Sequence, residues 1–280
     1  SSPDSEIEAV ILYATDVTEH VLARRRAEAL ATDLQAAVSA RDGFLSLASH
    51  ELKTPLTTLM LQTQMFRRQL ERDPAAAYSP ERTSRLVQQM DRQIERLTRL
   101  INDMLDISRL ASGRLTLQRE RCGLVALIRE VVERLSQLLT QAHCPVYIDA
   151  PVEIEGEWDR YRLEQVVTNL LINAARYGTG QPIEIFVARD NGTAVLRIRD
   201  HGRGIDRKDH ERVFQRFERA IPATEVSGLG LGLYISRQLV EMHQGWIELE
   251  SAPGEGATFS VHLPLEPVSA ALPRPKEQTG

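Results

Sequence analysis

The sequence predicts a multidomain protein in which an all-α helical hairpin, paired with a second copy as a dimeric four-helix bundle, precedes an α+β sandwich domain. Apolar residues recur at three- and four-residue spacing through two long segments before residue 113, a pattern typical of bundle helices. After residue 113, short apolar runs alternate with helical patterns. The length of 280 residues is sufficient for two compact units.

Composition narrows the classes of function. The net charge of −5 gives no reason to expect a nucleic-acid partner. No apolar run approaches the roughly 18 residues that span a bilayer, so we expect no membrane segment in this chain and a cytoplasmic location. Two cysteines, Cys122 and Cys144, are too few for a disulfide framework and are consistent with a reducing compartment.

The first helical segment follows a short apolar run. Ile7–Ala14 has the composition of a strand, so we expect residues 1–19 to end a sheet whose other strands lie elsewhere. Residues 20–43 have a coiled-coil pattern, and the helix continues to about Arg72. Arg41 and Pro55 interrupt its heptad seam. The seam residues are Leu34, Val38, Leu45, Ala48, Leu52 and Leu59.

A second helix is predicted after a proline-containing turn at 73–80, and Gly113 is its expected C-cap. One hairpin buries such stripes poorly, so we expect a homodimer through residues 20–113. The alternative is that the hairpin packs on its own C-terminal domain. The apolar stripe of the second helix comprises Val87, Met90, Ile94, Leu97, Ile101 and Met104.

Residues 114–266 have a mixed pattern, which favours an antiparallel-rich sheet with helices on one face. A hairpin is expected about Asn191-Gly192, a dipeptide suited to a tight turn. Residues 267–280, rich in proline and without periodicity, are expected to be a disordered tail or linker. The expected strands are 114–120, 146–148, 183–188, 194–199, 246–250 and 258–263, and the expected helices are 124–142, 159–177 and 231–243.

His50 is the first candidate for chemistry. It occupies heptad position f, where the imidazole is exposed, and a neutral imidazole is a nucleophile near neutral pH. Glu51 could accept the proton that the ring releases, and Thr54 lies one turn away on the same face. Pro55 lacks an N–H group, which predicts a bend or a loosened turn here. The alternative is an ordinary surface histidine.

A second candidate is the polar stripe formed by Asn169, Asn173 and Arg176 on an otherwise apolar helix. Amide oxygens are hard ligands and a guanidinium binds phosphate, so the stripe suits a magnesium–phosphate group. The alternative is that these side chains satisfy one another at the helix surface.

Three glycine-containing segments add to this site. Asp200–Ile205 places a carboxylate at a strand end, where it could accept a hydrogen bond from an exocyclic amine. Gly228–Leu233 opens a helix, whose free N–H groups favour phosphate, and a Gly-Lys-Ser/Thr element is absent from the sequence, which excludes a P-loop. Gly254–Phe259 turns into the last strand. Between the first two lies Phe214–Phe217, followed by a polar stretch to Ser227 that is long enough to be a mobile lid.

Together these motifs resemble the sensor histidine kinases of two-component systems over residues 44–264. His50–Pro55 is similar to the phosphoacceptor box and Asn169–Tyr177 to the asparagine box. Asp200–Gly204 and Gly228–Gly232 are similar to the two glycine boxes. Phe214–Phe217 is similar to the phenylalanine box, and Val10–Glu19 resembles the end of a PAS domain.

The resemblance implies a dimerisation and histidine phosphotransfer domain at 44–113 and a Bergerat-type ATP-binding domain at 114–266. His50 would then accept the γ-phosphoryl group of ATP with Glu51 as base, Thr54 would support phosphatase activity, and Asn173 would bind Mg²⁺. The implied partner is the receiver domain of a response regulator. The implied nucleotide-binding residues are Asn169, Asn173, Arg176, Tyr177, Asp200, Gly202, Gly204, Ile205, Phe217, Gly228, Leu229, Gly230, Leu231, Gly232, Leu233 and Thr258.

Two other functions stay open from the sequence. One is an ATPase of the related gyrase and chaperone group, which uses ATP to drive a conformational change. The other is a non-catalytic dimeric sensor or scaffold.

Overall fold

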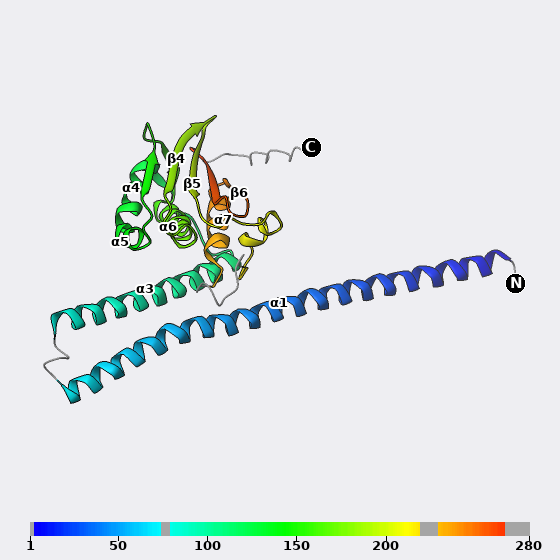
Figure 1. The fold of residues 1–280 in the computed structure, drawn as a ribbon. Coiled ribbons are helices and arrows are strands. Elements are labelled where there is room, and N and C mark those ends of the chain that lie inside the picture. The colour runs from blue at the N-terminus through cyan, green and yellow to red at the C-terminus, as the bar shows by residue number, and fades with distance from the viewer. Residues whose placement is uncertain (1–2, 74–78, 219–228, 267–280) are drawn as a thin grey trace. The chain divides into compact units, whose positions relative to one another are not determined.

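A computed structural model describes residues 3–73, 79–218 and 229–266 (Figure 1). The chain divides into two units, one ending at Thr54 and the other beginning at Pro55, and each is described by itself. Among the described residues, none of the helices is both long enough and apolar enough to cross a membrane.

Helix α1 (Pro3–Arg72) passes from one unit into the other and is continuous through Pro55. The strand predicted at Ile7–Ala14 is wrong, because these residues are helical. A lone strand leaves its backbone polar groups unpaired, whereas a helix pairs them internally. The resemblance of Val10–Glu19 to the end of a PAS domain stays a prediction.

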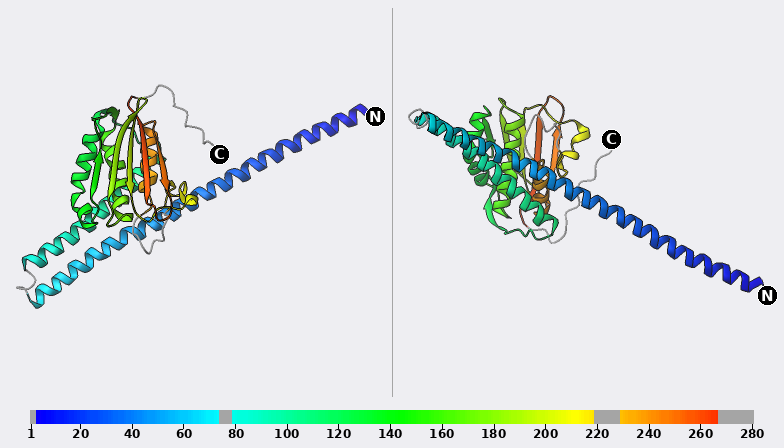
Figure 2. Two further views of the ribbon diagram at one scale, coloured as in Figure 1. Left: turned by 45° about the horizontal axis from the view of Figure 1, so that its top comes forward. Right: turned by 90° about the horizontal axis from the view of Figure 1, so that it is seen from below.

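The hairpin is completed by α3 (Pro80–Ala111), which begins with Pro80 after the N-cap Ser79. The two helices run antiparallel (Figure 2) and share a hydrogen bond from the Gln62 amide to that of Gln89, at 3.3 Å. The C-cap of α3 is Ser112 rather than the predicted Gly113, which follows it with φ +63° and ends the helix. Residues 74–78 of the predicted turn lie outside the described part of the chain.

The hairpin of a single chain leaves part of its apolar stripe exposed. On α3, about half of the surface of Val87, Ile94 and Ile101 is accessible. Leu56 and Met65 on α1 are at least as exposed. A stripe of this length favours a partner helix pair, so the homodimer predicted from the sequence has a surface on which to form.

The second domain is built on a five-stranded sheet of order β2-β4-β5-β7-β6, in which only the β2–β4 pair is parallel. Burial alternates along β4, so one face of the sheet is covered and the other is open. The helices lie on the covered face (Figures 1 and 2). The strands are β2 (Val146–Asp149), β4 (Ile183–Asp190), β5 (Thr193–Asp200), β6 (Trp246–Ser251) and β7 (Ala257–Pro264).

In the described part of this domain, four helices and two short 3₁₀ turns accompany the sheet. The helices are α4 (Leu124–Arg134), α5 (Ser136–Gln141), α6 (Arg160–Tyr177) and α7 (Gly232–Met242). The turns are η1 (Arg207–Asp209) and η2 (Arg212–Phe214). Helix α6 packs between α4 and α7 and against β5, so its buried leucines form the centre of the core.

Two predictions in this domain are wrong. The strand expected at 114–120 lies instead at β1 (Glu120–Gly123), which pairs with the unpredicted β3 (Glu155–Trp158). The helix expected at 124–142 is broken at Leu135, before Ser136, a residue whose hydroxyl competes for helix backbone groups. The β1–β3 pair depends on a long-range contact that local pattern does not encode.

Leu127 tests how much this core contributes to stability, because its side chain is 0% exposed within α4. We expect Leu127→Ala to lower the free energy of unfolding by about 3 kcal/mol, through lost burial and the cavity left behind. Urea unfolding followed by tryptophan fluorescence measures it. Arg129→Ala, an exposed change on the same helix, is the control, and equal losses in the two variants would contradict the packing assigned to Leu127.

Candidate functional site

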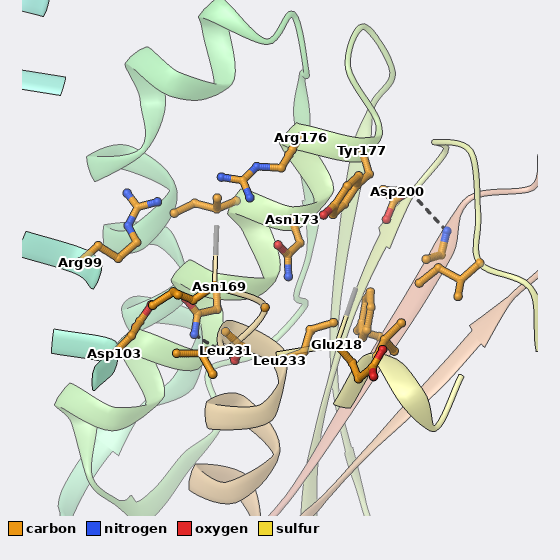
Figure 3. A pocket seen from close by; sticks show the side chains of 18 of the residues that line it. Arg99, Asp103, Asn169, Asn173, Arg176, Tyr177, Asp200, Glu218, Leu231 and Leu233 are labelled. Carbon is orange, nitrogen blue, oxygen red and sulfur yellow. Dashed lines mark hydrogen bonds between the residues drawn. The ribbon is translucent and has the colours of Figure 1, made fainter. Parts of the chain in front are cut away.

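A pocket of about 290 Å³ lies where α3, α6, the end of β5, the turn before α7 and the start of β7 meet (Figure 3). All of these elements belong to the unit that begins at Pro55. The pocket is therefore formed by α3 on one side and by the α+β domain on the others. A pocket lined by several elements is the expected position of the nucleotide-binding site that the sequence predicts.

Asp200 is the buried carboxylate of the pocket. It is the last residue of β5 and is 5% exposed. Its Oδ1 accepts hydrogen bonds from the backbone N–H groups of Gly202, at 2.9 Å, and Ala257, at 3.3 Å. Burial raises the pKa of this carboxyl, and the two N–H donors oppose that rise. The two bonds hold the carboxyl group in a set orientation, as a recognition group requires.

Close backbone contacts position Asp200. Gly204 and Gly256 have φ of +70° and +80°. A Cβ on Gly204 would collide with the carbonyl oxygen of Ala252, and one on Gly256 would collide with that of Asp200. Only glycine satisfies both the positive φ and the lack of space. Backbone contacts within the protein therefore require glycine at both positions.

The two asparagines of α6 differ in their surroundings. The Asn169 amide donates to the carbonyl of Gly232, at 3.2 Å, and to the hydroxyl of Ser236, at 3.4 Å, so it links α6 to α7. The Asn173 amide projects into the pocket (Figure 3), where it has no hydrogen bond to any of the residues that the structure describes. Asn173 is thus the amide that faces the pocket without a partner among the described residues, while Asn169 also holds two helices together.

Positive charge gathers at the α6 end of the pocket. Arg176, Tyr177 and Arg203 line it, and the Arg203 guanidinium lies over the Tyr177 ring, 5.6 Å from its centroid. Arg99 of α3 lies on the same side as Arg176 (Figure 3). The Arg99 residue is exposed, but partial burial of its guanidinium lowers its pKa, and the charge of Arg176 lowers the pKa further. Two neighbouring cations in a pocket favour an anionic ligand.

Most of the predicted nucleotide-binding residues come together here, although their individual roles stay predictions. Those that line the pocket are Asn169, Asn173, Arg176, Tyr177, Asp200, Gly204, Ile205, Leu229, Gly230, Leu231, Gly232 and Leu233.

Four predicted residues stand apart. Thr258 is not part of the lining, because strand alternation places it opposite its neighbours Ala257 and Phe259, which do line the pocket. Gly202 and Phe217 are also absent from the lining; Gly202 instead binds the Asp200 carboxylate through its N–H group. Gly228 lies outside the described residues.

The sequence missed the contribution of the hairpin. Arg96, Arg99, Leu100 and Asp103 of α3 all line the pocket. Their spacing places all four residues on one face of the helix. This spacing was the sequence pattern that could have indicated a shared surface. A charged stripe on a bundle helix is usually solvated, so the pattern did not distinguish a pocket wall from an exposed surface.

His50, the predicted phosphoacceptor, is exposed on α1 in the first unit. The Thr54 hydroxyl donates to the His50 carbonyl, at 3.1 Å. Pro55 has no N–H group to donate to the backbone carbonyl of Glu51. Helix α1 therefore lacks one backbone hydrogen bond of the i to i−4 type next to His50. The expected loosening is thus limited to this missing bond, since α1 remains helical.

Comparison with known proteins identifies both parts of the chain. Residues 40–113 match the His Kinase A (phospho-acceptor) domain. Residues 158–267 match the family of histidine kinase-, DNA gyrase B- and HSP90-like ATPases.

Individual relatives agree with these matches. Sensor histidine kinase MtrB of Mycobacterium leprae is 34% identical over 226 residues, which cover 79% of this chain and 39% of MtrB. The alginate biosynthesis sensor protein KinB of Pseudomonas aeruginosa is 31% identical over 236 residues, covering 84% of this chain and 38% of KinB. The structure of histidine kinase AdeS of Acinetobacter baumannii matches with a TM-score of 0.58 and 25% identity, over 77% of this chain and 98% of that one. The chain thus spans about two-fifths of the length of these curated relatives.

A phosphoacceptor hairpin followed by an ATP-binding domain of this type defines a class of signalling proteins. The chain belongs to that class, the sensor histidine kinases of two-component systems.

The carboxyl group of Asp103 is expected to make the stability of the protein depend on pH. Burial raises the pKa of its carboxyl to about 7, although Arg99 lowers it and Asp106 adds to the rise. The folded protein therefore holds this proton more tightly than the unfolded chain, whose pKa is near 3.8. Stability should fall as pH rises from about 4 to about 7 and then level off. Asp103→Asn removes the ionisable group, so its melting temperature relative to the wild type should be higher at about pH 8 than at about pH 5.

Thermal melts of both proteins at the two pH values measure this difference. Asp91→Asn, at an exposed position of α3 that does not line the pocket, is the control. A relative melting temperature of Asp103→Asn that does not change with pH would contradict the burial of the carboxyl.

Proposed function

We propose that the chain phosphorylates His50 with ATP and passes the phosphoryl group to an aspartate in the receiver domain of a response regulator. The observation that carries this proposal is the arrangement of Asn173, Arg176 and Asp200 around one pocket in a chain that also carries an exposed histidine in a phosphoacceptor domain.

The chemistry is phosphoryl transfer by positioning and neutralisation of charge. The imidazole nitrogen of His50 attacks the γ-phosphorus of ATP, an N–P bond forms, the bond to the β-phosphate oxygen breaks, and ADP leaves. Glu51 accepts the proton of the attacking imidazole. The phosphoryl group then moves from the histidine nitrogen to a carboxylate oxygen of the receiver, which regenerates the free imidazole.

Residues of the pocket suit a purine nucleotide. The Asp200 carboxylate uses only Oδ1 for Gly202 and Ala257, so Oδ2 can accept a hydrogen bond from the adenine amine. Arg176 supplies a guanidinium for phosphate oxygens. Gly230–Leu233 lead into α7 and line the pocket, where helix N–H groups favour negative charge.

The pocket also fits Mg²⁺ bound together with the nucleotide. Among the described residues there is no group of three His, Cys, Asp or Glu side chains that could hold a metal alone. Mg²⁺ commonly takes one or two protein oxygens and completes its shell with phosphates and water. The Asn173 amide, without a hydrogen bond to described residues, offers such an oxygen. The metal would supply neutralising charge for the triphosphate.

We further propose that the protein acts as a homodimer through residues 20–113. The exposed stripe that includes Val87, Ile94 and Ile101 supports this, because pairing with a second hairpin would remove these side chains from water.

His50→Gln tests the central step. The variant keeps a polar side chain but lacks the nucleophilic ring, so we expect no acid-labile ³²P on the protein after incubation with labelled ATP and Mg²⁺. ATP binding, measured by calorimetry, should be unchanged. His20→Gln is the control, because His20 is also exposed on α1, and it should be labelled like the wild type.

Undiminished labelling of His50→Gln would overturn the assignment. Steady ATP hydrolysis without any labelled protein in the wild type would favour the ATPase function instead. Absence of ATP binding would favour the non-catalytic scaffold.

Thr54→Ala tests the proposed phosphatase role. We expect removal of the hydroxyl to slow dephosphorylation of the receiver domain by about tenfold or more, because a water molecule loses its positioning group. Autophosphorylation should stay near the wild-type rate. Thr63→Ala is a matched control, since the Thr63 hydroxyl also donates to the carbonyl four residues earlier on α1, at 2.9 Å. Equal losses in the kinase and phosphatase reactions of Thr54→Ala would remove the separate role.

A further inference from the structure

Helix α3 supplies a wall of the nucleotide pocket. Four of its residues, including Arg99 and Asp103, line the space that Asn173 and Arg176 line from α6. Figure 3 shows Arg99 and Asp103 on one side of the pocket and Asp200 on the other, with Asn173 between them. A ligand that extends away from Asp200 past Asn173 therefore approaches the hairpin.

A buried ion pair anchors this wall. The Arg162 guanidinium of α6 donates to Asp106 Oδ1 of α3, at 2.8 Å, and the two side chains are only 10% and 8% exposed. The Gln165 amide donates to Asp106 Oδ2, at 2.8 Å, and its oxygen accepts from Arg162, at 3.0 Å. Removing one member would leave a charge buried without its partner. Asp106 lies two turns after Arg99 on the same face of α3, so the anchor holds the helix segment that carries Arg99.

The arginine side chains at this end of the pocket favour a negatively charged ligand. Arg96, Arg99 and Arg176 contribute three guanidinium groups, and Asp103 is the one acid among the described lining residues of α3. Glu95 and Asp103 act on Arg99 from its own helix, and both favour its charged form. The Arg99 residue is exposed, yet partial loss of hydration and the charge of Arg176 lower the pKa of its guanidinium. A ligand with several negative charges would favour the charged form of this side chain.

We propose that Arg99 is a phosphate-binding residue that completes the nucleotide site from the hairpin, sharing the terminal phosphates of ATP with Arg176 while Asp106 and Arg162 anchor α3. The inference rests on the proposed function and extends it. The number of phosphates on the nucleotide then determines how strongly α3 is held, and the coupling is reciprocal, because anchoring of α3 raises the affinity for ATP by the same factor.

Binding of ATP and of AMP to the full chain, both with Mg²⁺, tests this role of Arg99. We expect Arg99→Ala to weaken ATP binding by about tenfold or more, as the loss of a charge-assisted phosphate contact does. AMP lacks the terminal phosphates, so its affinity should change less than about twofold. Arg99→Lys should restore part of the ATP affinity, because it restores the charge but not the planar fork. Arg92→Ala, at an exposed position of α3 outside the pocket, is the control.

A double-mutant cycle tests the anchor. Asp106→Asn should also weaken ATP binding while AMP binding persists, and persistent AMP binding shows that the α+β domain is folded. If both residues act through the same contact, Asp106→Asn with Arg99→Ala should weaken ATP binding little more than either change alone. Fully additive losses would overturn the coupling between the anchor and the phosphate contact.

The outcomes separate the inference from the proposed function. Equal ATP affinities for Arg99→Ala and Arg92→Ala would overturn the role of Arg99, while ATP binding by the wild type would leave the proposed function in place. A wild-type protein that binds neither ATP nor AMP would overturn both.

Discussion

The close packing of backbone around the end of β5 is the constraint on which the pocket depends. Gly204 lies against the Ala252 carbonyl and Gly256 against that of Asp200, at distances that leave no space for a Cβ. This packing brings the N–H groups of Gly202 and Ala257 to the Asp200 carboxylate. A buried acid needs such donors, because an unpaired one would be costly to place in the core. A residue larger than glycine at position 204 or 256 would displace the Asp200 carboxylate, which is proposed to accept a hydrogen bond from the adenine amine.

A second consequence of the fold is that the hairpin and the α+β domain share one pocket. The sheet and α6 supply Asp200, Asn173 and Arg176, and α3 supplies Arg99 and Asp103. The Asp106–Arg162 pair joins α3 to α6 beside this pocket, and removal of either partner would leave a buried charge without its partner.

Local pattern predicted much of the fold and of the site. The hairpin about Asn191-Gly192, the amphipathic helix 159–177 and the glycine segment before α7 were recognisable because turn chemistry and periodicity are local properties. The strand at Ile7–Ala14 was predicted wrongly because its apolar residues are compatible with either helix or strand, and pairing decides between them. Thr258 was assigned to the site with its motif, but strand alternation excludes it from the pocket lining.

The sequence by itself determined the class of protein, the candidate phosphoacceptor His50 and most of the residues around the nucleotide pocket, because each depends on a short motif whose residues are close in the chain. Only the tertiary structure decided that Arg99 and Asp103 belong to that pocket and that Asp106 pairs with Arg162, 56 residues away. The physical reason is that charge patterns on a helix are the same whether the face is solvated or buried. Their meaning depends on which element packs against them, and that is set by contacts between distant parts of the chain.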